Sequence, residues 1–69
     1  MDKQRLNAYI KLIEREGKAT QDELMNWTAS NKFITKKHLL EFTESGLLTK
    51  KGKYYYLNKE GIELWESNL

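Results

Sequence analysis

The spacing of apolar residues changes after Gly46, and this change most constrains the fold. Before it, Leu39 and Phe42 lie three residues apart, as on one side of a helix. After it, residues 53–57 alternate like a β-strand, and Lys51-Gly52 is a turn candidate that separates them from an earlier strand. A helix closed by Gly46 in the left-handed conformation, followed by a β-hairpin, is therefore expected here.

An amphipathic helix is expected over residues 2–16. Its apolar positions recur at helical spacing at Leu6, Ile10 and Ile13. Asp2 can cap its start, and Gly17 can close it in the left-handed conformation. Tyr9 and Leu12 flank the apolar stripe and leave two alternatives, core packing or contact with another subunit. Core packing is favoured because a small domain has few helices.

A second helix is expected to begin at Gln21 and to end near Ala29 or Ser30. Thr20 and Glu23 have the spacing of a capping box, in which each side chain accepts a hydrogen bond from the other residue's backbone amide. Residues 18–20 before it are interpreted as a connector. Leu24 and Trp27 supply its buried side, and Trp27 is expected in the core because tryptophan carries a large apolar area.

The start of the third helix has two readings. If Asn31 is the cap, the helix begins at Lys32. If Thr35 is the cap, Ile34 precedes it and can pack on Leu39 as a hydrophobic staple, and packing favours this reading. In both readings the first turn is taken to include Lys36 and Lys37. Cations are disfavoured there by the helix dipole, which suggests an anionic partner.

A closing helix is expected from Lys59 to Glu66, capped by Asn58. Its inward face would consist of Ile62, Trp65 and Leu69 and would pack on the first helix. The chain of 69 residues is thus expected to be one α+β domain, residues 1–69, with three helices, a hairpin and a last helix.

Charge is distributed unevenly along the chain. The net charge is only +2, yet residues 31–53 carry six lysines against two glutamates, whereas the remainder is mildly acidic. Successive side chains of a strand point to opposite faces, so Tyr55 and Leu57 share one face of the hairpin and Tyr54 and Tyr56 share the other. At least one tyrosine face therefore stays partly exposed, either to stabilise the hairpin or to make a contact.

Several function classes are not favoured. Cysteine is absent and His38 is the single histidine, so no metal site or cofactor is expected. No apolar run approaches the about 20 residues of a membrane span, and the first residues are unlike a signal peptide, so a soluble cytoplasmic protein without membrane contact is expected. No phosphate loop or nucleophile motif points to an enzyme, and Glu60, Glu63 and Glu66 are interpreted as a solvated helix face.

The order of these elements, and several residues, resemble the winged helix-turn-helix domain of bacterial and archaeal transcription regulators. The resemblance spans about residues 17–65. Its motifs are Thr20 to Leu24, Leu39 with Phe42, Gly46-Leu47-Leu48, and Tyr55 to Gly61. It implies double-stranded DNA as the partner, with the third helix in the major groove and the hairpin as a wing on the phosphate backbone.

The resemblance places one set of residues at the DNA, with Leu40 and Gln21 beside them and His38 as a packing residue. The set is Lys32, Phe33, Thr35, Lys36, Lys37, Lys50, Lys51 and Lys53. A homodimer is implied because paired modules read two half-sites. The alternative is a protein-binding winged helix, an adaptor or inhibitor that docks through exposed aromatics. Candidate protein contacts are Tyr9, Leu12, Tyr54, Tyr56, Leu64 and Leu69.

Overall fold

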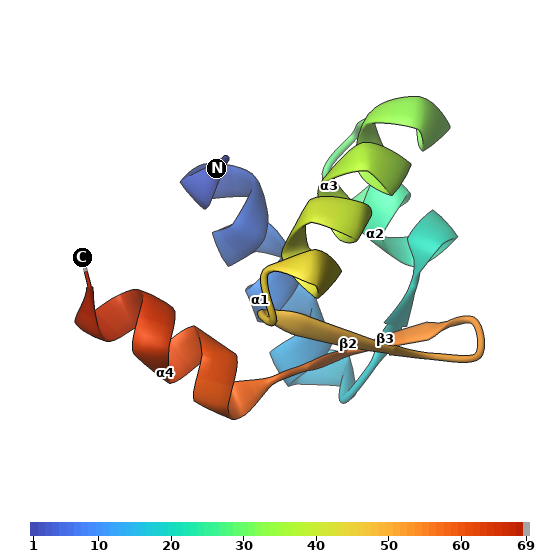
Figure 1. Cartoon of the computed structure of the whole chain (residues 1–69). Coiled ribbons are helices and arrows are strands. Elements are labelled where there is room, and N and C mark those ends of the chain that lie inside the picture. Colours follow the sequence, from blue (N-terminus) through green and yellow to red (C-terminus); the bar gives the residue numbers. More distant parts are fainter. Residues whose placement is uncertain (69) are drawn as a thin grey trace.

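The computed structural model describes residues 1–68, and within them the chain forms four helices and three strands (Figure 1). They are α1 (Lys3–Glu16), β1 (Ala19–Thr20), α2 (Gln21–Trp27), α3 (Lys32–Glu44), β2 (Leu48–Lys51), β3 (Tyr54–Leu57) and α4 (Lys59–Ser67). Because the helices are separate from an antiparallel sheet, the predicted α+β class is confirmed. None of the helices in this part of the chain has the length and apolar character needed to span a membrane.

The sheet has the order β1-β3-β2, and both pairings are antiparallel. β3 is the central strand: Tyr55 lies opposite Ala19 of β1 and Lys50 of β2. The interpretation of residues 18–20 as a plain connector is therefore wrong, because β1 joins the sheet. A two-residue strand has no alternation of its own, and it exists here only because β3 supplies its hydrogen-bond partners.

The first two helices begin as predicted. The Asp2 carboxylate accepts a hydrogen bond from the Arg5 amide at 3.0 Å. In the capping box, the Glu23 amide donates to the Thr20 hydroxyl at 3.2 Å, and the Thr20 amide donates to the Glu23 carboxylate at 2.8 Å. Gly17 follows α1 with φ of 86°, the left-handed conformation that glycine adopts without steric strain. These hydrogen bonds satisfy backbone amides that the helices themselves leave unpaired.

The favoured prediction, in which Thr35 caps the third helix, is wrong. Asn31 is the cap, and its side chain accepts a hydrogen bond from the Ile34 amide at 2.9 Å. Thr35 lies inside α3 and is wholly buried, so it is one of three residues on the inward stripe with Leu39 and Phe42. The earlier start adds Lys32, Phe33 and Ile34 to the helix, and the Asn31 cap satisfies a backbone amide of its first turn.

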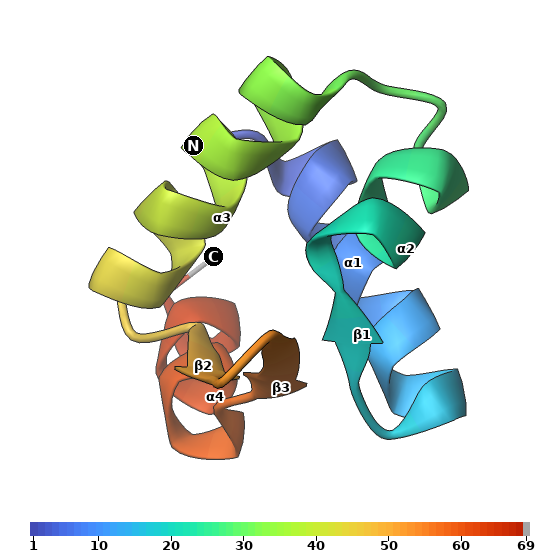
Figure 2. The same cartoon turned by 90° about the vertical axis from the view of Figure 1, so that its right-hand side faces the viewer.

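The core lies between the sheet and the first three helices, which are grouped together (Figure 2). Its largest members are Tyr9 and Phe42, whose rings meet edge to face with centroids 5.6 Å apart. Tyr9 is fully buried and Leu12 is nearly so. The favoured alternative, core packing, is confirmed for both residues. The prediction that Tyr9 and Leu12 are protein contacts is wrong, because the chain itself already covers them.

Trp27 is not a core residue, contrary to the prediction. Its side chain lies at the end of α2 and is 43% exposed. The indole N–H donates to the Ala8 carbonyl oxygen of α1 at 2.8 Å, and the Arg15 guanidinium lies 5.0 Å from the ring centre. An indole nitrogen needs an acceptor, and this acceptor lies at the surface where α1 and α2 meet.

The closing helix begins and ends close to the predicted bounds, but Asn58 does not cap it with its side chain. Instead, the Asn58 side-chain amide donates to the Gly46 carbonyl oxygen at 2.7 Å and ties α4 to the end of α3. α4 leaves the hairpin at the end remote from its turn (Figure 1). Ile62 is buried and Trp65 partly so, as predicted, while Leu69 lies outside the described residues.

Candidate nucleic-acid interface

The outward face of α3 combines basic and apolar side chains. At about 3.6 residues per turn, this face lies opposite the stripe of Thr35, Leu39 and Phe42. The exposed side chains among residues 32–40 of α3 are Lys32, Phe33, Lys36, Lys37 and Leu40. Phe33 is 79% exposed and Leu40 is 59% exposed, so two large apolar side chains two turns apart on one side of α3 face solvent.

Thr35 does not belong to this face. Its side chain is 0% exposed, and its hydroxyl has no hydrogen-bond partner within the described chain. The prediction that Thr35 contacts DNA is therefore wrong, because the earlier start of α3 turns this residue toward the core. The same shift moves Lys36 and Lys37 into the second turn, so the expected dipole penalty of first-turn lysines does not apply to them.

Charge changes sign along α3. The lysines occupy the amino-terminal half, and Glu41 and Glu44 are exposed in the carboxyl-terminal half, next to the hairpin. Within residues 1–68, none of the α3 lysines lies within ion-pair distance of a carboxylate. The amino-terminal half of α3 therefore presents its positive charge to solvent.

His38 packs on the body of the protein, as predicted. Its Nδ1 lies 2.9 Å from the Ile34 carbonyl oxygen, which can only accept, so Nδ1 carries a proton. Its Nε2 lies 3.9 Å from the Asp2 carboxylate. The pKa of Asp2 is lowered chiefly by the hydrogen bond from the Arg5 amide, and the charge of the Arg5 guanidinium adds to the effect. His38 thus joins α3 to the start of α1.

The hairpin carries three exposed lysines, Lys50, Lys51 and Lys53. β2 includes Lys51, so the turn is made by Gly52 and Lys53, one residue later than predicted. Gly52 has φ of 62°, the left-handed region that a turn of this kind requires of its first residue. The hairpin projects away from the helices (Figure 1), so its lysines lie at a free end of the molecule.

Each of these lysines lies over the ring of a hairpin tyrosine. Lys51 Nζ lies 5.5 Å from the centre of the Tyr56 ring, and Lys50 Nζ lies 5.8 Å from that of Tyr55. Tyr54 has two such neighbours, Lys53 at 5.4 Å and Lys18 at 4.2 Å. Tyr55 is buried, whereas Tyr54 and Tyr56 are partly exposed, which confirms that the alternation divides the tyrosines between two faces.

Lys18 is a surface residue of this cluster that the sequence did not reveal. It precedes β1, and β1 lies beside β3 only in the folded chain. A single lysine in a presumed connector carries no pattern that would assign it to a sheet. The pairing of Ala19 with Tyr55 is what brings Lys18 beside the tyrosines, and the sequence carries no signal for that pairing.

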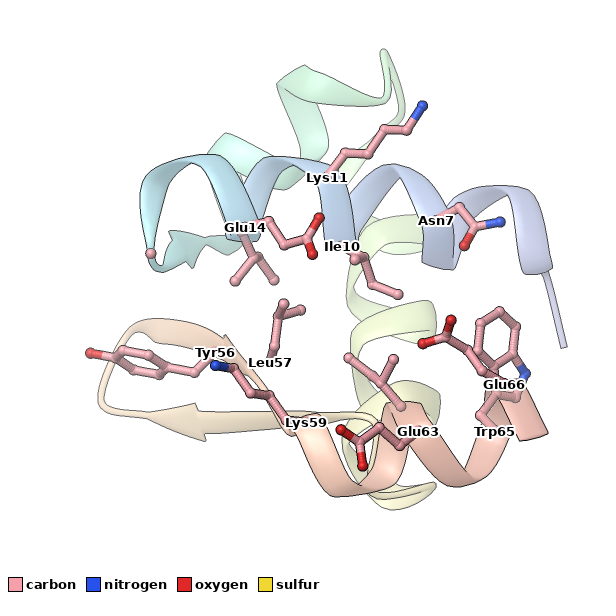
Figure 3. A pocket seen from close by; sticks show the side chains of 13 residues that line it. Asn7, Ile10, Lys11, Glu14, Tyr56, Leu57, Lys59, Glu63, Trp65 and Glu66 are labelled. Carbon is pink, nitrogen blue, oxygen red and sulfur yellow. The ribbon is translucent and has the colours of Figure 1, made fainter. Parts of the chain in front are cut away.

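A cleft of about 960 Å³ separates α1 from α4. Apolar side chains line its interior, from Ile10 on one side to Leu57 and Trp65 on the other, and Glu14 and Glu63 stand at its edges (Figure 3). Tyr56 lines the hairpin end of the cleft, and its ring extends outward from there. Leu64, a candidate protein contact on α4, is 65% exposed. Across residues 1–68, no group of three acidic or histidine side chains is placed to hold a metal ion.

Comparisons with protein-family models, with curated proteins and with solved structures found no match. The functional assignment therefore depends on the geometry of the chain itself. Seven of the eight residues predicted to contact DNA are exposed, in two groups: Lys32, Phe33, Lys36 and Lys37 on α3, and Lys50, Lys51 and Lys53 on the hairpin. A surface of this composition suits a polyanion.

Proposed function

We propose that this chain is a winged helix-turn-helix domain that binds double-stranded DNA as a small transcription regulator. The order helix, strand, helix, helix, hairpin supports it, with β1 paired to the hairpin and α2 joined to α3 by a short turn. The observation that carries the proposal is the exposed basic face of α3, which lies opposite its buried stripe. Such a regulator acts in the cytoplasm of a bacterial or archaeal cell.

In this proposal α3 enters the major groove, which is about 12 Å wide and admits one helix. Lys36 and Lys37 then reach base edges or phosphates, while the hairpin lysines hold phosphates beside the groove. No arginine stands on α3 or the hairpin, so the most common bidentate reader of guanine is absent from both elements. Phosphate contacts therefore contribute most of the affinity, and binding depends strongly on salt.

Two copies of the chain would strengthen the binding, because one small module makes few contacts and paired modules read two half-sites. The apolar cleft between α1 and α4 is the surface that suits such a homodimer. Sedimentation over a range of concentrations measures it. A species that stays at about 8 kDa at high concentration removes the dimer and leaves the DNA-binding proposal intact.

A second candidate function is protein binding by the same fold, as an adaptor or inhibitor. It is favoured by the exposed Phe33 and Leu40 on α3, because aromatic and aliphatic side chains dominate the cores of protein interfaces and lysines are depleted there. The two candidates differ in which substitutions matter: the lysines of α3 for DNA, and Phe33 with Leu40 for a protein.

Titration of labelled mixed-sequence duplex DNA at two salt concentrations tests the proposal. The variant Lys36→Ala with Lys37→Ala removes two charges from α3, and Lys3→Ala at the exposed start of α1 is the matched control. The double variant should bind more weakly, with a salt slope smaller by up to about 1.8, whereas the control should bind like the wild type. Equal binding by all three proteins, or none by the wild type at low salt, overturns the proposal.

A further inference from the structure

The outer face of the sheet is a separate surface with its own chemistry. Antiparallel register sets Tyr54 opposite both Lys51 and Thr20, and Tyr56 opposite Thr49, so these side chains share one face. The opposite face, with Tyr55, belongs to the core. Thr49 and Lys51 are exposed, so no helix covers the outer face along β2.

Positive charge surrounds the two tyrosines of this face. Lys18 and Lys53 flank the Tyr54 ring, and Lys51 lies over the Tyr56 ring. Among the described residues, these lysines have no carboxylate within ion-pair distance. The Glu23 carboxylate, which accepts a hydrogen bond at the cap of α2, also feels the charge of Lys53. Such a surface suits nucleic acid, because bases can stack on the aromatic rings while the unpaired lysines bind the neighbouring phosphates.

We infer that the outer face of the sheet is a second binding site, which takes single-stranded nucleic acid. Bases stack on the Tyr54 and Tyr56 rings, and Lys18, Lys51 and Lys53 move from the rings to the phosphates. Residues two apart on a strand are separated by about 6.8 Å, twice the about 3.4 Å rise between nucleotides in one duplex strand. Adjacent bases therefore reach both rings only in a strand that is unpaired and extended.

This site differs from the proposed duplex site because it requires no residue of α3. The two sites share the hairpin lysines Lys51 and Lys53, and Lys18 belongs to the sheet site alone. Substitutions on α3 and at the tyrosines therefore separate them, and either site can be refuted while the other stands.

The test measures fluorescence anisotropy of a labelled oligothymidylate of about 12 nucleotides, a length within the range bound by single-strand modules. Threonine replaces both rings in the variant Tyr54→Thr with Tyr56→Thr, because threonine keeps strand propensity without a ring. The matched control is Tyr54→Phe with Tyr56→Phe, which keeps both rings. A third protein carries Lys36→Ala and Lys37→Ala.

The threonine variant should bind the oligonucleotide about 100-fold more weakly, about tenfold for each ring, while the phenylalanine and α3 variants stay within about threefold of the wild type. The inference is overturned if the wild type fails to bind at low salt, if the threonine variant binds normally, or if the α3 variant alone loses binding. Tyrosine variants that retain the oligonucleotide but lose a protein partner also overturn it, in favour of a protein contact.

Circular dichroism reports whether the threonine variant is folded. If it is not, Lys18→Gln decides, because Lys18 lies at the edge of the sheet and is exposed. This variant should weaken oligothymidylate binding and lower its salt slope by about 0.7, the value for one phosphate contact on a single strand. An unchanged affinity and slope overturn the inference.

Discussion

Substitution of Gly61 by alanine should destabilise the protein, although alanine is the better helix former. Gly61 lies on the side of α4 that meets Gly46, between α3 and β2. A Cβ atom at Gly61 would overlap the Gly46 carbonyl oxygen and approach the Gly46 carbonyl carbon to 2.8 Å. Gly46 has φ of 76° and its carbonyl accepts the Asn58 hydrogen bond, so the obstacle is constrained backbone. α4 must therefore move away.

Three contributions set the size of the effect. Alanine at a helix interior gains about 1 kcal/mol over glycine. Displacement of α4 loses the hydrogen bond between Asn58 and Gly46, about 1 kcal/mol. It also exposes Ile62, the one buried residue in the described part of α4, whose burial is worth about 2 kcal/mol. The free energy of unfolding should thus fall by about 2 kcal/mol.

Urea unfolding of Gly61→Ala measures this loss. With a slope of about 1 kcal/mol per molar for so small a domain, the midpoint should fall by about 2 M. Glu63→Ala on the exposed side of α4 is the matched control and should leave the midpoint nearly unchanged. Asn58→Ala isolates the hydrogen bond and should show about half of the loss. A Gly61→Ala midpoint at or above that of the wild type refutes the packing of α4 on Gly46.

Three further predictions concern charge and capping. Glu41→Gln with Glu44→Gln should strengthen duplex DNA binding, measured by anisotropy, because both carboxylates are exposed on α3; weaker binding would contradict the placement of α3 at the DNA. Thr20→Ala should lower the free energy of unfolding by about 1 kcal/mol through loss of the α2 cap, and Thr20→Ser should restore most of it. The pKa values of Asp2 and Glu23 are lowered, each chiefly by a backbone amide that donates a hydrogen bond to the carboxylate. The two carboxylates therefore stabilise the folded protein above about pH 4, and this contribution is lost as the pH falls further. Urea midpoints from pH 7 to pH 3 should show this loss, and Asp2→Asn with Glu23→Gln should flatten it.

Local signals in the sequence determined the ends of several elements. The Asp2 cap, the capping box of Thr20 and Glu23, and the left-handed glycine after α1 were all predicted correctly. The alternation of residues 54–57 correctly separated buried Tyr55 from partly exposed Tyr54 and Tyr56. These features depend on hydrogen bonds and side-chain directions within about four residues, so the nearby sequence contains the information that specifies them.

The tertiary structure decided which segments that are far apart in the sequence come into contact. Asn31 and Thr35 are both able to cap a helix, and only the folded structure shows that Asn31 is the cap and that Thr35 lies in the core. The same choice removed Thr35 from the candidate interface. Trp27 lies at the surface because its acceptor, the Ala8 carbonyl, is on another helix. Lys18 joined the tyrosines because β3 pairs with β1. Burial and pairing of this kind depend on which elements meet in space, and no short stretch of sequence carries that information.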